Sequence, residues 1–507
     1  MPLPAIPTAL AAASVGAFLI YMVFFRRAKR FPNEPPVDMG MIPWLGHALA
    51  FGKDAATFLT KMKAKHGDIF TVHVAGKYVT VLLDPHSYDA VVWESCGKLD
   101  FNEYAKILMK RMFAVQLPNY DPATEKAMMK VHLQNKNLPA LTKSMFSNLK
   151  NILIEDPERK HSTWKEEGLF QLSYSVMVRA GFLTLFGNDS ADCNDPKLRA
   201  QDRQFSADIY KHFQQLDQFL MKAARAMLSA EETNDLDSVR KSLWGLLSIN
   251  KLNLTANRSS WLETYLKHLE SVGVEEDLQA KAVVVQLWAT QGNAGPACFW
   301  LLLFLLKNPK AMAAVEKELQ EIFKNKARPL DEKEATCQEV LDSAHVFDSV
   351  FYETLRLTAA PFITREVLKD MPLRLANEKE YTLRKGDRLC LFPYLSPQMD
   401  PEIYEDPEKF EYDRFLKADG SKKTEFFKGG KKLKHYNMPW GAGSNECIGR
   451  FFAINSIKQF VFILLTYFEL ELKAPRQKIP SFDNSRYGFG IMQPAYDITI
   501  RYRAKHS

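Results

Sequence analysis

Hydrophobic residues follow different periodicities along the chain, and each periodicity predicts a different kind of element. Residues 69–74 and 78–83 alternate in polarity on either side of a short turn that contains glycine, which predicts a β-hairpin. Residues 278–306 are apolar on nearly every side, which predicts a helix buried through the centre of the molecule. Further helices are predicted at 342–357 and 451–468. The expected class is mainly α with a small β portion.

The N-terminus contains an uncharged apolar run at residues 9–25, close to the lower limit of about 17 residues for a membrane-spanning helix. A cleaved secretory signal is the alternative. However, no basic region precedes the run, and the bulky Phe24 and Phe25 stand where cleavage needs small residues. The basic segment 26–30 follows, and the positive-inside rule then keeps the rest of the chain in the cytosol. We therefore expect an uncleaved transmembrane anchor at 1–25.

A proline-rich segment separates this anchor from the body of the protein. The prolines in 31–36 have fixed backbone dihedrals and make a short, stiff spacer. Residues 26–40 are therefore predicted as a basic, proline-rich linker. Residues 41–507 are predicted as one catalytic domain, because no internal repeat or low-complexity tract interrupts them. The expected location is the endoplasmic reticulum membrane, crossed once, with the catalytic domain in the cytosol.

Composition narrows the classes of function. The chain is 46% hydrophobic and 25% charged, as globular proteins are, and its net charge of +7 is mild for 507 residues. Because no dense block of Lys and Arg lies among aromatics, nucleic acid is not an expected partner, whereas an anionic membrane lipid surface is. The six cysteines form no C-x-x-C pair, so we expect free thiols in a reducing compartment.

One cysteine, Cys447, lies in the glycine-containing loop 439–450, directly before a predicted helix. The positive end of the helix dipole and nearby backbone N–H groups are expected to lower the pKa of its thiol. Glycines in the loop are expected to let a flat cofactor approach closely. Taken alone, the loop is equally consistent with a buried structural cysteine.

The spacing Trp440-x-x-Gly443-x-x-x-Cys447-x-Gly449 resembles the haem-binding signature F-x-x-G-x-x-x-C-x-G of the cytochrome P450 superfamily. The resemblance implies the P450 fold and haem b as cofactor, with the Cys447 thiolate as the ligand of the iron and with Trp440 and Gly443 beside the haem. Trp440 replaces the usual Phe. Asn445 stands where the superfamily commonly has an Arg or His that contacts a haem propionate, so that contact must come from elsewhere.

Two further landmarks of the superfamily follow in the expected order. Glu353 and Arg356, three residues apart on a predicted helix, resemble the E-x-x-R motif, and Arg414 resembles the residue that completes a buried Glu-Arg-Arg network. An isolated E-x-x-R is equally typical of an exposed helical ion pair. Arg365 lies just beyond this helix, where relatives place an arginine that binds a propionate. An ordinary surface arginine is the alternative.

The predicted central helix lacks the acid used by relatives that activate dioxygen. Their motif A-G-x-[D/E]-T is replaced by residues 289–293, in which Gly292 carries no carboxylate and Asn293 has no titrating side chain to supply a proton. Pro296 has no N–H to pair with the carbonyl of Gly292, so we expect it to bend the helix. Sterol hydroxylase relatives carry an asparagine near this position and still use dioxygen, so Asn293 alone does not decide the reaction.

Over nearly the whole body, the chain resembles the members of the superfamily that isomerise prostaglandin endoperoxides. This resemblance implies that prostaglandin H2 is the substrate and prostacyclin the product, and that neither NADPH nor a redox partner is required. Asn293 would orient the endoperoxide. Further positions that match residues lining haem or substrate are Arg111, Leu117, Thr364, Arg365 and Arg388. A core residue at 117 and a solvated turn residue at 388 are the plainer interpretations.

Other functions stay open at this point. One is an NADPH-dependent sterol or fatty-acid monooxygenase of the bile-acid hydroxylase type, and another is a haem sensor without turnover. Dehydration of fatty-acid hydroperoxides is an expected side reaction, because those substrates also bring a weak O–O bond. No histidine stands at metal-ligand spacing such as H-E-x-x-H, so a second metal site is not expected.

Overall fold

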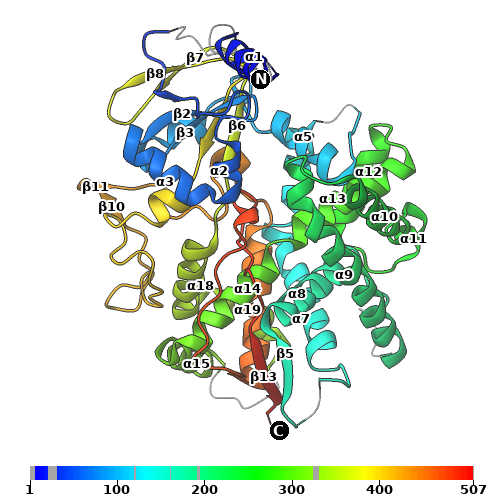
Figure 1. The fold of residues 1–507 in the computed structure, drawn as a ribbon. Coiled ribbons are helices and arrows are strands. Elements are labelled where there is room, and N and C mark those ends of the chain that lie inside the picture. The colour runs from blue at the N-terminus through cyan, green and yellow to red at the C-terminus, as the bar shows by residue number, and fades with distance from the viewer. Residues whose placement is uncertain are drawn as a thin grey trace, which may run out of the picture.

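The computed structural model describes residues 6–20, 31–118, 121–159, 162–190, 195–323 and 330–505. Helices dominate these residues and strands form a smaller part, which confirms the expected class (Figure 1). The longer helices are α1 (Ile6–Ile20), α3 (Ala55–His66), α5 (Asn102–Phe113), α6 (Pro122–His132), α7 (Leu138–Leu153), α8 (Leu169–Leu185), α9 (Pro196–Ala224), α10 (Ala230–Leu246), α12 (Ser260–Ser271), α13 (Glu276–Gln291), α14 (Ala294–Lys307), α15 (Pro309–Ile322), α18 (His345–Thr358) and α19 (Arg450–Tyr467).

The largest sheet has six strands in the order β1-β2-β3-β9-β6-β4, in which the edge strands β1 (Val37–Asp38) and β4 (Leu99–Asp100) are short. The predicted hairpin is confirmed, because β2 (Ile69–Val74) and β3 (Lys77–Leu82) pair in antiparallel register. Strand β9 (Arg388–Leu391) pairs in parallel with β3 and antiparallel with β6 (Ile363–Val367). The other strands of three or more residues are β5 (Lys165–Gly168), β7 (Met371–Arg374), β8 (Glu380–Leu383), β12 (Phe468–Leu472) and β13 (Thr499–Ala504).

The register of β6 separates two charged neighbours that matter for the site. Arg365 pairs with Leu389 of β9, and Glu366 pairs with Arg388. Because successive side chains of a strand point to opposite faces, Arg365 and Glu366 leave β6 on opposite sides of the sheet. The strand therefore contributes a charged group to each face.

The predicted central helix is two helices. α13 ends at Gln291 and α14 begins at Ala294, so the break falls at Gly292 and Asn293. Pro296 lies in the first turn of α14, where a missing N–H costs little because the first N–H groups of a helix have no partner within it. The expected distortion is therefore a helix boundary rather than a bend within one continuous helix.

α14 forms the centre of the hydrophobic core. All of its residues from 295 to 305 are buried, and it packs against α8, α18 and α19. Gly295 permits the contact with α8, because a Cβ there would lie 2.7 Å from the Cα of Tyr174. Figure 1 shows α14, α18 and α19 in the middle of the molecule, with the six-stranded sheet beyond one end of them and β5 and β13 near the other.

The predicted N-terminal anchor is only partly described. Helix α1 has 15 residues, and both the remainder of 1–25 and the basic segment 26–30 lie outside the described residues. Within the described chain no single helix is long and apolar enough to cross a membrane. The segment Glu276–Lys307, which comprises α13 and α14, has sufficient length and apolar composition only together with Pro309–Ile322, and the two are bent by 108°. The described cysteines are all free thiols, as expected, and Cys193 lies outside the described residues.

Candidate functional site

Backbone contacts hold Cys447 at the end of its loop, just ahead of a helix. The N–H of Cys447 donates to the carbonyl of Trp440 over 2.9 Å, which closes the loop on itself. Helix α19 then begins at Arg450, with Gly449 as its N-cap. The thiol therefore lies immediately before a helix N-terminus, as predicted.

The Cys447 side chain is exposed to an open space on one side and surrounded by protein on the others. Burial by the surrounding protein raises the pKa of the thiol above its ordinary value. The N–H of Gly449 and the positive charges of Lys126 and Arg450 act in the opposite direction, but burial is the larger effect. The expected lowering of the pKa is therefore wrong for the protein alone. A coordinated metal ion deprotonates such a thiol outright.

Two glycines of this loop, Gly443 and Gly449, have different surroundings. Gly443 has φ +65°, and a Cβ there would lie 2.1 Å from the carbonyl oxygen of Val92 at the end of α4 (Asp89–Val92). Gly443 is therefore required for the loop to pack on α4, which is a different reason from the expected approach of a flat cofactor. At Gly449, a Cβ would meet no atom within 4 Å, so open space lies beside Cys447 there.

Arg365 is buried and incompletely hydrogen-bonded. Its Nη1 donates to the carbonyl of Thr364 over 2.9 Å, and its guanidinium lies 5.9 Å from the ring centroid of Phe101. Its Nη2 has no partner among the described residues, and burial lowers the pKa of the group. The indole Nε1 of Trp440 is likewise buried with no partner in the described chain. Unpaired buried donors are costly, so both suit a ligand that carries hydrogen-bond acceptors.

Lys126 joins this region, although sequence reasoning did not single it out. Its ammonium on α6 donates to the carbonyl of Ser444 in the cysteine loop over 2.5 Å. Burial lowers its pKa, and the charges of Cys447 and Arg365 also influence it, so these groups lie within electrostatic range. The contact joins residues 318 positions apart, which no local pattern reveals. The only sequence signal was the basic pair of Lys126 and Lys130 at i,i+4.

Asn293, at the break between α13 and α14, has a fixed orientation. Its Oδ1 accepts the N–H of Ile491 over 2.9 Å. Gly490 makes this approach possible, because a Cβ there would lie 2.3 Å from the same oxygen. The side chain is exposed, as is that of Ala289 one turn earlier, and Nδ2 has no partner among the described residues. The amide therefore offers its two N–H donors to a ligand.

The predicted Glu-Arg-Arg network forms in the structure. Arg356 donates to both oxygens of Glu353 over 2.7 and 2.8 Å, and Arg414 donates to Glu353 over 3.0 Å. The side chains of Glu353 and Arg356 are completely buried. Arg356 also donates to the carbonyls of Gln398 and Pro407, each over 2.7 Å. The network therefore ties α18 to the segment that leads into the cysteine loop.

Arg388 and Thr364, which are also predicted to contact haem or substrate, contact other side chains of the protein. Arg388 forms an ion pair with Glu366 over 2.5 Å, and its guanidinium lies 4.7 Å from the ring centroid of Tyr104. Thr364 is buried, with its hydroxyl 3.9 Å from the sulfur of Cys390. These contacts hold both residues in the sheet.

Two of the predicted contacts lie at or beyond the end of α5. Arg111 donates to the carbonyl of Ala224, the last residue of α9, over 3.0 Å. Leu117 is half-buried and lines a cavity between α5 and β6. The structure thus places Arg111 and Leu117 around α5, on different elements from the cysteine loop.

Comparisons with known proteins agree with this geometry. The Cytochrome P450 family profile matches residues 35–500. This chain belongs to the cytochrome P450 family. The prostacyclin synthases of Rattus norvegicus and Homo sapiens are 58% and 57% identical to this P450 over 476 residues, which cover 94% of it and 95% of each relative. The 7-alpha-hydroxycholest-4-en-3-one 12-alpha-hydroxylase of Oryctolagus cuniculus is 40% identical, over 97% of this chain and 98% of the relative.

The residues of this P450 fit its family's cofactor, a haem held by a cysteine thiolate, and the predicted cofactor is confirmed. Cys447 borders open space, so its sulfur can reach an iron. The unpaired Nη2 of Arg365 and Nε1 of Trp440, together with the ammonium of Lys126, suit the two anionic propionates of a haem.

Proposed function

We propose that this P450 isomerises prostaglandin H2 to prostacyclin without NADPH or a reductase. The proposal rests on Asn293, whose amide is fixed by the N–H of Ile491 at the position where oxygen-activating relatives carry an alcohol, next to Gly292 at the position of their acid. Sequence identity supports the same conclusion, because the chain is 57–58% identical to prostacyclin synthases but only 38–40% identical to 12-alpha-hydroxylases.

When bound, a haem thiolate supplies the means to split a peroxide O–O bond. Cys447 holds the group as its sulfur ligand, and Arg365, Trp440 and Lys126 neutralise or hydrogen-bond its propionates. Asn293 binds one oxygen of the endoperoxide through Nδ2–H and so orients the O–O bond for cleavage. The substrate brings this bond ready-made, so the protein need not deliver protons to dioxygen.

Residues 289–293, at the end of α13 and the break after it, support a role in orientation rather than proton delivery. The hydroxyl of Thr290 donates to the carbonyl of Gln286 over 2.8 Å, so its proton is engaged within the helix. Residues 289–293 contain no Asp, Glu or His. This stretch therefore offers hydrogen bonds for orientation and no titrating acid. Further substrate contacts are proposed for Arg111, Leu117, Thr364 and Arg388, on the strength of their matched positions.

We also propose that residues 1–25 anchor the protein in the endoplasmic reticulum membrane, that 26–40 form a linker, and that 41–507 form the cytosolic catalytic domain. Support comes from apolar side chains exposed by 46–63% on α1, where water contact is unfavourable. Met41 and Trp44, just beyond the linker, are exposed by 93% and 63%. A lipid surface would cover such side chains. The exposed residues of α1 are Leu10, Val15, Phe18, Leu19 and Ile20.

The test is to incubate the purified holoenzyme with prostaglandin H2 in the absence of any reductant. Formation of 6-keto-prostaglandin F1α, the hydrolysis product of prostacyclin, supports isomerisation. Turnover only in the presence of NADPH and reductase, with a sterol or fatty acid as substrate, would instead establish a monooxygenase. Fatty-acid hydroperoxides, assayed in parallel, are expected to be dehydrated as a side reaction. The Cys447→Ala variant is the control for non-enzymatic decay.

A further inference from the structure

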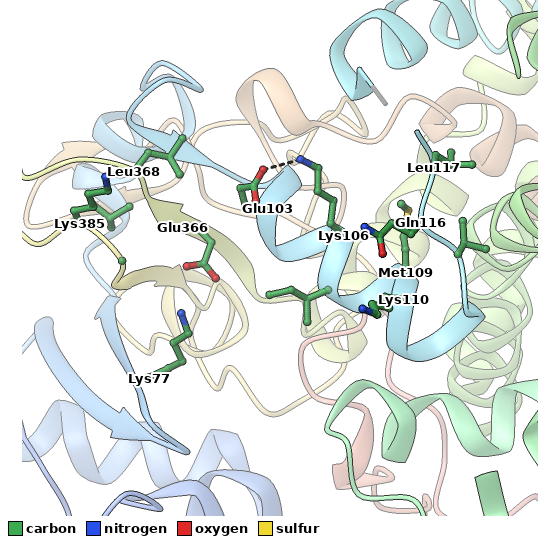
Figure 2. A pocket seen from close by; sticks show the side chains of 14 residues that line it. Lys77, Glu103, Lys106, Met109, Lys110, Gln116, Leu117, Glu366, Leu368 and Lys385 are labelled. Atoms are coloured by element: carbon green, nitrogen blue, oxygen red, sulfur yellow. Dashed lines mark hydrogen bonds and ion pairs between the residues drawn. The ribbon is translucent and has the colours of Figure 1, made fainter. Parts of the chain in front are cut away.

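A cavity of about 680 Å³ lies between α5 and β6, and no residue of the loop 439–450 lines it (Figure 2). Its size is within the range of about 300–1,000 Å³ that small-molecule sites occupy. Much of the wall is apolar, so it can cover a hydrocarbon chain. The apolar lining residues are Ile107, Met109, Val115, Leu117, Val367 and Leu368.

The acidic groups in this wall are already paired. Glu103 forms an ion pair with Lys106 over 2.7 Å, one turn along α5. Glu366 is buried and forms an ion pair with Arg388 over 2.5 Å. Neither carboxylate therefore remains to neutralise a further cation in the wall.

Three other lysines in the wall, Lys77, Lys110 and Lys385, form no ion pair with any described residue. They come from three places: the start of β3, the last turn of α5, and the turn between β8 and β9. Figure 2 shows them spaced around the cavity, with Lys77 and Lys385 on different sides of Glu366. The backbone N–H of Lys385 donates to Asp370 over 2.9 Å, which holds that turn in place. The cavity thus joins an apolar wall to an uncompensated positive rim.

We propose that this cavity binds a long-chain carboxylic acid, with its hydrocarbon chain along the apolar wall and its carboxylate among Lys77, Lys110 and Lys385. Charge-assisted hydrogen bonds from ammonium groups are stronger than neutral ones, and convergent cations raise the local concentration of an anion. A neutral lipid would gain nothing from this rim, and a small inorganic anion would leave the apolar wall uncovered.

The cavity also has a place in substrate capture. Glu366 of β6 lines the cavity, whereas its neighbour Arg365, which leaves the strand on the opposite face, does not line it. Prostaglandin H2 is itself a long-chain carboxylic acid, so the site would collect substrate one strand away from the haem-binding residues. This role rests on the proposed function, whereas the binding of a lipid acid does not.

Equilibrium dialysis of radiolabelled oleate against the holoenzyme tests the binding step. An azole ligand is first bound to the iron, so that oleate cannot be counted at the haem. Wild type is expected to bind oleate, and the double variant Lys77→Glu/Lys385→Glu to bind it at least about tenfold more weakly. The matched control Lys310→Glu/Lys379→Glu changes the same net charge at exposed lysines outside the cavity and should bind as wild type does. Equal affinity of the two double variants would overturn the proposal.

Two further binding measurements test the proposal with other ligands. Methyl oleate, which lacks the carboxylate, should bind wild type far more weakly than oleate, and equal binding would overturn the proposal even if a variant failed to fold. Vesicles of phosphatidylserine and of phosphatidylcholine replace oleate in the other arm. If the cavity variant lost only its preference for phosphatidylserine vesicles and bound oleate normally, the lysines would serve a membrane surface and the proposal would be wrong.

Kinetics separate the capture role from the proposed function. With prostaglandin H2, the cavity variant should raise KM at unchanged kcat, because the affected interaction lies outside the reacting atoms. If wild type does not turn over prostaglandin H2 at all, the proposed function fails while the oleate result still stands. Unchanged KM together with weakened oleate binding would confine the cavity to a lipid site without a role in capture.

Discussion

Replacing Asn293 by Asp tests whether the distal amide acts as a hydrogen-bond donor. Asp has nearly the same shape, and its carboxylate can still accept the N–H of Ile491, now in a charge-assisted hydrogen bond. Only the two N–H donors are lost. The fold should therefore be retained, while the endoperoxide loses its partner.

The size of the effect follows from the single hydrogen bond at stake. A neutral hydrogen bond contributes about 0.5–1.5 kcal/mol, which corresponds to about 2- to 13-fold in affinity or rate. The carboxylate also repels the lone pairs of a peroxide oxygen, so we expect Asn293→Asp to lie at the upper end, near a tenfold loss in kcat/KM. Optical titration with a stable endoperoxide analogue should show a matching loss of affinity.

The structure provides a matched control for this substitution. Asn377 lies in an exposed turn, where its Oδ1 accepts the N–H of Lys379 over 3.1 Å, the same arrangement in a place without a site. Asn377→Asp makes the same change in net charge and should leave kcat/KM unaltered. The reasoning is refuted if Asn293→Asp stays within about twofold of wild type while folding normally, or if both variants lose activity equally.

Three other changes should give measurable results. Gly490→Ala would place a Cβ 2.3 Å from Oδ1 of Asn293, so analogue affinity should fall about tenfold in the same titration, and wild-type affinity would contradict the contact. Glu353→Gln removes the charge that compensates the buried Arg356 and should lower the free energy of unfolding in urea by about 3–5 kcal/mol, whereas a loss below about 1 kcal/mol would indicate a solvated pair. Burial raises the pKa of the Cys447 thiol, so it is protonated at pH 7, and haem uptake should release about one proton. Calorimetry in two buffers of different ionisation enthalpy measures that proton, and its absence would mean that the thiolate preexists.

Sequence alone determined the elements whose signals are local. The β2–β3 hairpin follows from alternating polarity over a few residues, and α19 follows from apolar residues that recur along 451–468. The spacing of Glu353 and Arg356 was enough to place both side chains on one helix face. The loop before α19 identified Cys447, because glycine spacing is a property of neighbouring residues.

Tertiary structure decided what depends on packing between distant segments. The amide of Asn293 is oriented by Ile491, which lies 198 residues away, and Lys126 reaches a loop 318 residues away. The pKa of Cys447 rises instead of falling because the effect of burial exceeds that of the Gly449 N–H and the nearby positive charges. Burial depends on distant segments, so the local sequence does not predict it. Periodicity extends over a few residues, whereas burial and contact depend on which helices and strands come together, so these features needed the folded chain.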